Sequence, residues 1–550
     1  MCILETHMSS WWNPLDWLAE FLALKFDSDL PSLRFFLTIC FGYPISAIYL
    51  GFISKKPPRA SHIYFVITGL ILLCWNYGLN VIHLFVGIYS TLAALHIFGP
   101  TNQSVALTFI FNMTYLLIGY YYMNYGTYDI NWTMSYCILC LRLIGLAWDY
   151  RDGSLPVESL SEYQKNAAIK QLPDALEIAS FCFMPTSCFA GPQFTWRHYQ
   201  SFVNRTLRPK IVLENRSSMQ KHLLNPKLHR TLSRLSTGVI CLALNIFSQF
   251  YFPMDYMTTK KFLTEHSFFY RLGYMGCYSK FLIFRYLAIW LIGEGACVFL
   301  GLGCTGRVRI ECKKKEEGVD KKVDDEKTPP TTAQLRKAAI LSSSAGAGFC
   351  LESELSPEDL RAVREGRAIV VEDQHTRCAN VSIVRYELAT NTDLLVSSFN
   401  INTNKWMLEY LYKRLRFLGN KVLSQACTLI FLAVWHGFYS GYYINFLLEF
   451  LTIYAEKQFL MIVHRSIYAD FLYGTLAGKI LTTILGKLHI FFLLSSPLVA
   501  FSLLRASLWI PVFNSVYWIG FIYLLWPIAV PLVKRLFPPK DPKPSTPVSN

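Results

Sequence analysis

The chain has 550 residues, of which 53% are hydrophobic and 16% charged, and its mean hydropathy is +0.30. A soluble protein carries about a quarter charged residues, so this composition excludes an ordinary soluble globular protein. The formal charge of +15 does not indicate nucleic-acid binding, because the basic residues flank apolar blocks, as they do in the cytosolic loops of membrane proteins.

Residues 1–30 are predicted to form an N-terminal segment at the membrane surface. The stretch WWNPLDWLAEFLALKF at 11–26 is amphipathic, and it carries Trp11, Trp12 and Trp17. Tryptophan gathers at the interface between lipid and water, where its ring and its N–H are both satisfied.

About eleven apolar stretches follow, each long enough to cross a bilayer as a helix of roughly 20 residues. They lie near residues 33–53, 61–79, 80–100, 104–124, 131–149, 234–252, 266–284, 286–303, 421–450, 484–504 and 507–533. Because lipid leaves backbone polar groups without water, such continuous apolar runs predict helices. We therefore expect an all-α polytopic membrane protein with about eleven transmembrane helices.

The chain divides into five predicted regions. Transmembrane helices occupy 31–304 after the N-terminal segment, and the apolar stretch near 175–192 is predicted to be re-entrant because it contains Pro185, Gly191 and Pro192. A cytosolic loop follows at 305–397, and its charge-mixed insertion at about 307–372 is predicted to be disordered. A second transmembrane region, predicted to be catalytic, spans 398–535, and a cytosolic tail spans 536–550. The basic loops at 54–60 and 533–544 place the C-terminus in the cytosol.

His436 lies within the apolar and aromatic run FLAVWHGFYSGYYINF at 431–446. An ionisable group at membrane depth is costly and indicates a functional site, although a hydrogen bond between helices would also explain it. Gly437 and Gly441 share a helix face that permits close approach of another helix or a ligand, and Tyr442 adds a polar group.

Upstream, the sequence SFNINTNKW at 398–406 gathers side-chain amides beside an aromatic residue. Asn400, Thr403 and Trp406 are three residues apart and fall on one helical face. An N-cap and turn is the alternative explanation, and it is the preferred one for Asn402 and Asn404.

The basic stretch EYLYKRLRFLGNK at 409–421 contains Lys413, Arg414 and Arg416. It is explained equally by a helix at the membrane interface and by an electrostatic cradle for an anionic, phosphate-rich substrate. Sequons occur at Asn102, Asn112, Asn131, Asn204, Asn215 and Asn380, and several lie in or beside spans, so they are weak signals.

These motifs resemble the membrane-bound O-acyltransferase family, in its lysophospholipid acyltransferase branch and most closely its animal lysophosphatidylcholine members. WHGFYSGYYINF at 435–446 matches the pattern WHGxxxGYxxxF, and FNINTNKW at 399–406 is similar to the family's asparagine motif, with Phe399 in place of the usual Trp. AWDYRDG at 147–153 supplies a further motif in Trp148 and Asp149.

The resemblance implies an intramembrane reaction chamber in which acyl-CoA donates an acyl group to the sn-2 hydroxyl of a lysophospholipid. It implies His436 as general base and Asn400 as a hydrogen-bond donor in catalysis. The predicted substrate-binding residues are Trp435, Gly437, Tyr442, Thr403, Trp406, Lys413, Arg414, Arg416, Trp148 and Asp149. We expect no metal and no cofactor, with acyl-CoA acting as a substrate. Membrane lipids are the expected partners, and the endoplasmic reticulum membrane is the expected location.

Two other functional classes remain open from the sequence. One is a member of the same family with a lysophosphatidylinositol, sterol, diacylglycerol or protein acceptor. The other is a membrane transporter, because broken helices and intramembrane charges also occur along transport paths.

Overall fold

The computed structural model describes residues 14–26, 28–123, 130–207, 226–304, 307–312, 350–351, 368–371, 375–493 and 495–540. Trp11, Trp12, most of the insertion at 307–372 and the tail beyond 540 lie outside these residues. Three short strands, β1 (Arg307–Cys312), β2 (Cys350–Leu351) and β3 (Ala368–Val371), form an antiparallel sheet in the order β2-β1-β3. Every other regular element in the described part of the chain is helical.

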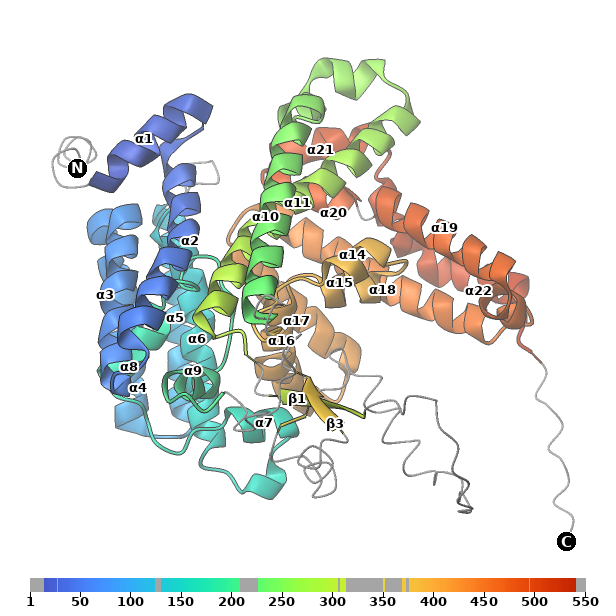
Figure 1. Ribbon diagram of the computed structural model, residues 1–550. Helices are drawn as coiled ribbons and strands as arrows, with labels where there is room; N and C mark the ends of the chain where they lie inside the picture. Colours follow the sequence, from blue (N-terminus) through green and yellow to red (C-terminus); the bar gives the residue numbers. More distant parts are fainter. Residues whose placement is uncertain are drawn as a thin grey trace, which may run out of the picture.

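The N-terminal helices form a bundle, drawn in blue to cyan in Figure 1. It comprises α1 (Pro14–Phe26), α2 (Leu30–Ile48), η1 (Tyr49–Ile53), α3 (Pro58–Tyr77), η2 (Gly78–Val81), α4 (Ile82–Phe98), α5 (Asn102–Tyr122) and α6 (Trp132–Asp152). Side chains of Asp29, Thr101 and Asn131 cap α2, α5 and α6 by accepting hydrogen bonds from first-turn amides. The shorter η3 (Val157–Ser159), α7 (Glu162–Ala167), α8 (Ala175–Cys182) and α9 (Trp196–Val203) follow.

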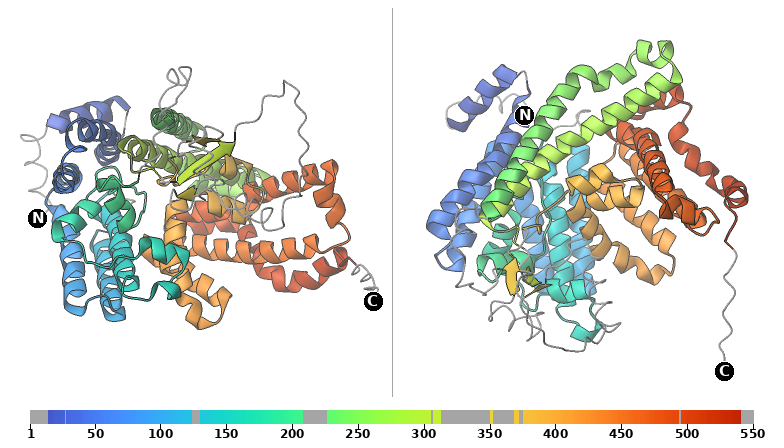
Figure 2. Two further views of the ribbon diagram at one scale, coloured as in Figure 1. Left: turned by 60° about the horizontal axis from the view of Figure 1, so that its bottom comes forward. Right: turned by 45° about the vertical axis from the view of Figure 1, so that its right-hand side comes forward.

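A long antiparallel pair of helices follows the bundle in the chain. It consists of α10 (Pro226–Tyr251) and α11 (Phe268–Leu300), joined through η5 (Met254–Thr258) and η6 (Lys261–Glu265), and the right-hand view of Figure 2 shows the two long helices side by side. The remaining elements are α14 (Ile383–Leu388), α15 (Thr392–Ser398), α16 (Ile401–Tyr410), η8 (Tyr412–Leu418), α17 (Lys421–His436), α18 (Ser440–His464), η9 (Asp470–Gly474), α19 (Leu476–Leu493), α20 (Ser495–Leu503), α21 (Ala506–Ser515), η10 (Ile519–Leu525) and α22 (Trp526–Leu536).

Seven runs of described helix are long and apolar enough to cross a membrane. They are Leu30–Ile53, Pro58–Phe98, Asn102–Tyr122, Lys227–Thr258, Phe268–Leu300, Leu476–Leu503 and Ile519–Leu536, and α17 is a shorter apolar helix. Apolar side chains such as Ile67, Ile110 and Phe250 lie exposed on their outer faces, as expected of surfaces that contact lipid. The predicted all-α polytopic membrane fold is confirmed.

Several predicted spans differ from the structure: the predicted span 507–533, for example, is divided among α21, η10 and α22. Two other differences have a local physical reason. Two spans, 266–284 and 286–303, are predicted where the structure has the single helix α11, Phe268–Leu300. Arg285, where the two predicted spans meet, is exposed on the helix and does not interrupt its backbone. Residues 421–450 form two helices instead of one, since the chain turns at Gly437, whose φ of +122° is disfavoured for residues with a side chain.

The segment after α8 leaves the helical path while buried inside the protein, in the stretch predicted to be re-entrant. Residues Ser180 to Phe189 are all buried. The guanidinium of Arg142, on α6, donates hydrogen bonds to the backbone carbonyls of four residues there: Phe181, Cys182, Ser187 and Pro192. A broken helix at this depth needs partners for its free carbonyls, and Arg142 supplies them.

Candidate active site

His436 is the last residue of α17, a helix that Asn420 caps by accepting hydrogen bonds from the amides of Val422 and Leu423. Its Nδ1 lies 2.7 Å from the carbonyl oxygen of Leu432. A carbonyl only accepts, so Nδ1 carries the proton and Nε2 is left with a lone pair. The local geometry thus presents the tautomer that a general base requires.

Four aromatic rings surround the imidazole. The ring centroids of Trp435, Phe446, Tyr442 and Phe501 lie 4.7, 5.2, 5.5 and 5.6 Å from that of His436. Tyr442 and Phe446 come from α18, and Phe501 comes from α20. The ring therefore lies in a largely apolar enclosure at the meeting point of three helices.

Trp435 fixes this end of α17 against the N-terminal bundle. Its Nε1 donates to the carbonyl of Cys137 on α6 at 3.0 Å, and its own carbonyl accepts from the hydroxyl of Tyr120 on α5 at 3.0 Å. A Cβ at Gly437 would lie 3.6 Å from the ring of Tyr120. Trp435 and Gly437, both predicted to bind substrate, thus position the helix end that carries His436.

Asn400 precedes α16 in the left-handed conformation, with φ 49° and ψ 43°, a region that asparagine tolerates better than most residues. Its side chain does not cap the helix that follows. Instead its Oδ1 accepts a hydrogen bond from Nδ2 of Asn380 at 3.2 Å. Asn402 and Asn404 donate to the carbonyls of Ala379, Val396 and Phe399, in agreement with their predicted role in the turn.

A row of aromatic rings connects the surroundings of His436 with those of Asn400. Phe501, which contacts His436, lies 6.5 Å from Tyr286, and Tyr286 lies 6.0 Å from Trp290, both on α11. Trp290 in turn lies 4.9 Å from Phe399, the residue before Asn400. All four rings are partly exposed, so they form one continuous apolar wall between the two predicted catalytic residues.

Thr403 and Trp406 are buried in α16, and Trp406 donates through Nε1 to the carbonyl of Leu141 on α6 at 2.9 Å. One turn later, the hydroxyl of Tyr410 donates to Asp149 at 2.8 Å. Asp149 is buried, and this contact gives it a partner on α16. Trp406 and Asp149 therefore hold α16 against α6, beside the cavity described next.

A cavity lies between α6, α16 and the segment that links α8 to α9. Its polar lining consists of Arg142, Asp149, Tyr163, Gln193, Thr195, Arg377, Asn402, Lys405 and Tyr410, and apolar residues including Trp406 complete it. The cations Arg377 and Lys405 face it, whereas the one carboxylate among the lining residues, Asp149, is engaged by Tyr410. The cavity thus has excess positive charge.

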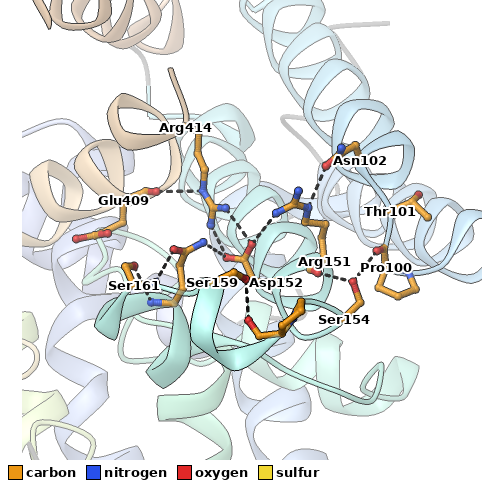
Figure 3. Close-up of polar contacts among 12 residues, drawn as sticks. Pro100, Thr101, Asn102, Arg151, Asp152, Ser154, Ser159, Ser161, Glu409 and Arg414 are labelled. Carbon is orange, nitrogen blue, oxygen red and sulfur yellow. Dashed lines mark hydrogen bonds and ion pairs between the residues drawn. The ribbon is translucent and has the colours of Figure 1, made fainter. Parts of the chain in front are cut away.

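Two of the three basic residues predicted to cradle the substrate have carboxylate partners within the chain. Arg414 contacts both oxygens of buried Asp152 at 2.9 and 2.5 Å and lies over the ring of Trp148 at 4.2 Å. Figure 3 shows Asp152 held between Arg414 and Arg151. Lys413 pairs with Glu409 at 2.6 Å, while Arg416 is exposed.

The structure thus gathers the sequence-predicted residues into two groups, which the row of aromatic rings connects. One group surrounds His436 and contains Trp435, Gly437 and Tyr442. The other contains Asn400 and Thr403 at the start of α16, together with Trp406 and Asp149, which line the cavity. Phe501 and Arg377 were not predicted, because they carry no recognisable local pattern. Asp152 lies in the quoted stretch AWDYRDG, but only Trp148 and Asp149 were predicted there to have a role. Asn380 was recognisable only as a sequon, and in the structure it is buried against Asn400.

Comparisons with known proteins agree with this arrangement. The model of the membrane-bound O-acyltransferase family matches residues 117–525, a range that contains both His436 and Asn400. Lysophospholipid acyltransferase 5 of Homo sapiens is 30% identical over 524 residues, which cover 95% of this chain and 93% of that protein. The protein of the same name from Drosophila melanogaster is 31% identical over 519 residues, covering 93% and 89%.

A more distant relative is the lysophospholipid acyltransferase of Schizosaccharomyces pombe, 25% identical over 422 residues, which cover 75% of this chain and 68% of that protein. The family match and the animal relatives each extend over most of the chain. The resemblance inferred from the sequence is confirmed: this protein belongs to the membrane-bound O-acyltransferase family and is an acyltransferase.

Proposed function

We propose that the protein transfers a fatty acyl group from acyl-CoA to the free sn-2 hydroxyl of a lysophospholipid, in phospholipid remodelling. Lysophosphatidylcholine is the favoured acceptor, with the ethanolamine and serine forms as further acceptors. The names of the relatives support the lysophospholipid class. The observation that carries the proposal is the tautomer of His436, whose Nε2 is free to accept a proton because Nδ1 faces the Leu432 carbonyl.

In the proposed reaction, Nε2 of His436 removes the proton from the acceptor hydroxyl while its oxygen attacks the thioester carbonyl of acyl-CoA. Charge then develops on the carbonyl oxygen, and Nδ2 of Asn400 is the donor that stabilises it. When the tetrahedral intermediate collapses, the C–S bond breaks and the CoA sulfur takes the proton from the imidazolium. The products are a diacyl phospholipid and free CoA.

The cavity beside α16 is the proposed contact for the phosphates of the donor. Arg377 and Lys405 line it, and polyanionic CoA would complement their charge. The exposed Arg416 is the proposed third cation, at the entry side. The row of rings from Phe399 to Phe501 is the proposed wall along the acyl chain. We also propose that the protein resides in the endoplasmic reticulum with its C-terminus in the cytosol.

The test uses full-length protein in lipid nanodiscs, with oleoyl-CoA as donor and release of free CoA as the readout. Release should depend on added lysophosphatidylcholine and yield a diacyl product by mass spectrometry. The variant His436→Ala should lower kcat by about 10²- to 10⁴-fold, the usual contribution of a general base.

His464→Ala is the matched control, because His464 also lies in the last turn of an apolar helix but is exposed and stacks on Tyr473. It should keep wild-type activity. A panel of lysophospholipids, diacylglycerol and a sterol then separates acceptors. A His436→Ala enzyme with more than a tenth of wild-type activity would refute the proposed base, and turnover of diacylglycerol or sterol alone would refute the acceptor class.

A further inference from the structure

Asn380 lies in a short extended segment that pairs with the chain around Asn400. Val381 and Phe399 form an antiparallel bridge, and the amide of Ser382 donates to the carbonyl of Ser398 at 2.9 Å. On the other side of Asn400, the amide of Ile401 donates to the carbonyl of Asn380 at 2.9 Å. These backbone contacts clamp Asn380 against the first turn of α16.

The side chain of Asn380 takes over the capping that Asn400 does not perform. An asparagine at an N-cap normally uses its own oxygen to accept from an amide of the first turn. Here Oδ1 of Asn380 accepts from the amide of Asn402 at 3.0 Å, while the side chain of Asn400 makes no capping bond. The amide of Asn400 is thereby released from a structural task.

The same contact decides which way the amide of Asn400 faces. A backbone N–H only donates, so the atom of Asn380 beside Asn402 is the oxygen, and the other atom is the NH2 group. That NH2 group donates to Asn400 at 3.2 Å, so the atom of Asn400 it meets is the oxygen. The NH2 group of Asn400 is therefore turned away from Asn380, and no hydrogen bond from it is formed within the described residues.

We propose that Asn380 is a positioning residue for the acyl transfer, which orients the amide of Asn400 so that its NH2 group, and not its oxygen, faces the reacting carbonyl. The inference rests on the proposed function, in which Asn400 stabilises the oxyanion. Asn380 is buried, with 6% of its surface exposed, so it acts through Asn400 without contacting the substrate. A donor held in place before the reaction stabilises developing charge without a cost of reorientation.

Asn380→Asp is the informative substitution because it is isosteric and separates the two contacts. The carboxylate still accepts from the amide of Asn402, so the cap of α16 persists. It no longer donates to Asn400, whose amide then rotates to donate to the new carboxylate, and the donor is withdrawn from the reaction. We expect kcat to fall by about 100-fold, the effect of losing one oxyanion donor, with KM for oleoyl-CoA changed less than about threefold.

A double-substitution cycle shows whether Asn380 acts through Asn400. If it does, Asn380→Asp adds less than about twofold to the loss already caused by Asn400→Ala. Multiplicative losses would overturn the proposal, as would Asn380→Asp retaining more than a third of wild-type kcat. If Asn380→Asp does not yield folded protein, Asn380→Ser, which also lacks the amide nitrogen, must show the same selective loss of kcat.

Two controls exclude other causes. Ser382→Ala removes the same sequon while leaving Asn380 in place, and its full activity would exclude loss of a glycan. Asn391→Asp makes the same change at the N-cap of α15, where the oxygen accepts from the amide of Leu394, and it should be active. If Asn400→Ala keeps wild-type activity, the proposed catalytic role of Asn400 is refuted. If Asn400→Ala is inactive but Asn380→Asp keeps wild-type activity, only the positioning role of Asn380 is refuted.

Discussion

The buried guanidinium of Arg142 offers a quantitative test of how the broken segment after α8 is held in the protein. Its two terminal nitrogens donate to four carbonyls at 2.9 to 3.3 Å, and only 2% of the residue is exposed. A hydrogen bond to a charged group contributes about 1.5–3 kcal/mol, and an unsatisfied buried carbonyl costs a similar amount. Leaving all four buried carbonyls without a partner should therefore cost about 6 kcal/mol, comparable with the whole stability of many proteins.

Two substitutions divide this contribution. Arg142→Met removes all four bonds, and we expect it to give no monodisperse protein. Arg142→Lys keeps the charge on one nitrogen, which cannot reach the carbonyls of both guanidinium nitrogens, so it should lose two bonds and about 3 kcal/mol. With an unfolding entropy near 2 cal/mol/K per residue, that loss corresponds to a fall in Tm of about 3 °C.

Fluorescence-detected size-exclusion chromatography after heating measures both effects. Arg197→Lys is the matched control, because Arg197 also donates to two backbone carbonyls, those of Lys165 and Ala168, but is exposed. It should change Tm by less than about 1 °C, in line with weak exposed contacts. An Arg142→Met protein that is monodisperse and melts within about 1 °C of wild type would refute the reasoning.

Three further predictions follow from other contacts. Arg414→Ala leaves buried Asp152 with weaker pairing and should lower the free energy of unfolding by about 3 kcal/mol, seen as a lower Tm. Substitution of the exposed Arg416 by Ala should leave Tm unchanged and raise KM for acyl-CoA. The opposite pattern would show that Arg414 is the substrate contact. In Gly437→Ala the added Cβ would lie at an ordinary van der Waals distance of 3.6 Å from the Tyr120 ring, so the cost comes from the backbone φ of +122°. This strain of about 1–3 kcal/mol should disturb His436 and lower kcat at least tenfold. Unchanged kinetics would contradict a role for this turn. Burial, with the nearby charge of Arg377, lowers the pKa of His198 from 6.5 to about 3. Between these two pH values the imidazole is protonated in the unfolded chain but not in the folded protein. Stability is therefore lost as the pH falls through that window. His198→Gln should therefore lessen the fall in stability between pH 7.5 and 5 by about 2 kcal/mol, and an unaltered dependence of Tm on pH would contradict the assignment.

The sequence by itself determined the membrane class, the helical fold and the family. Apolar length and charge distribution act locally, because a helix satisfies its own backbone in lipid wherever the run is long enough. The motif WHGFYSGYYINF likewise needs only its own spacing to be recognised. For the same reason local patterns misplaced boundaries: the charge of Arg285 interrupts an apolar run without ending α11, and one glycine with positive φ divides a run that was predicted as continuous.

Only the tertiary structure decided what each polar side chain is occupied with. Arg414 and Arg416 are equivalent in the sequence, but one is neutralised by Asp152, 262 residues away, and the other is exposed. Asn380 is recognisable in the sequence only as a sequon, and an N-cap remained an alternative for the asparagine cluster around Asn400. In the fold, Asn380 caps α16 and the NH2 group of Asn400 has no partner within the described residues. Hydrogen bonds and ion pairs depend on distance in space, and residues far apart in the chain meet only after the helices have packed.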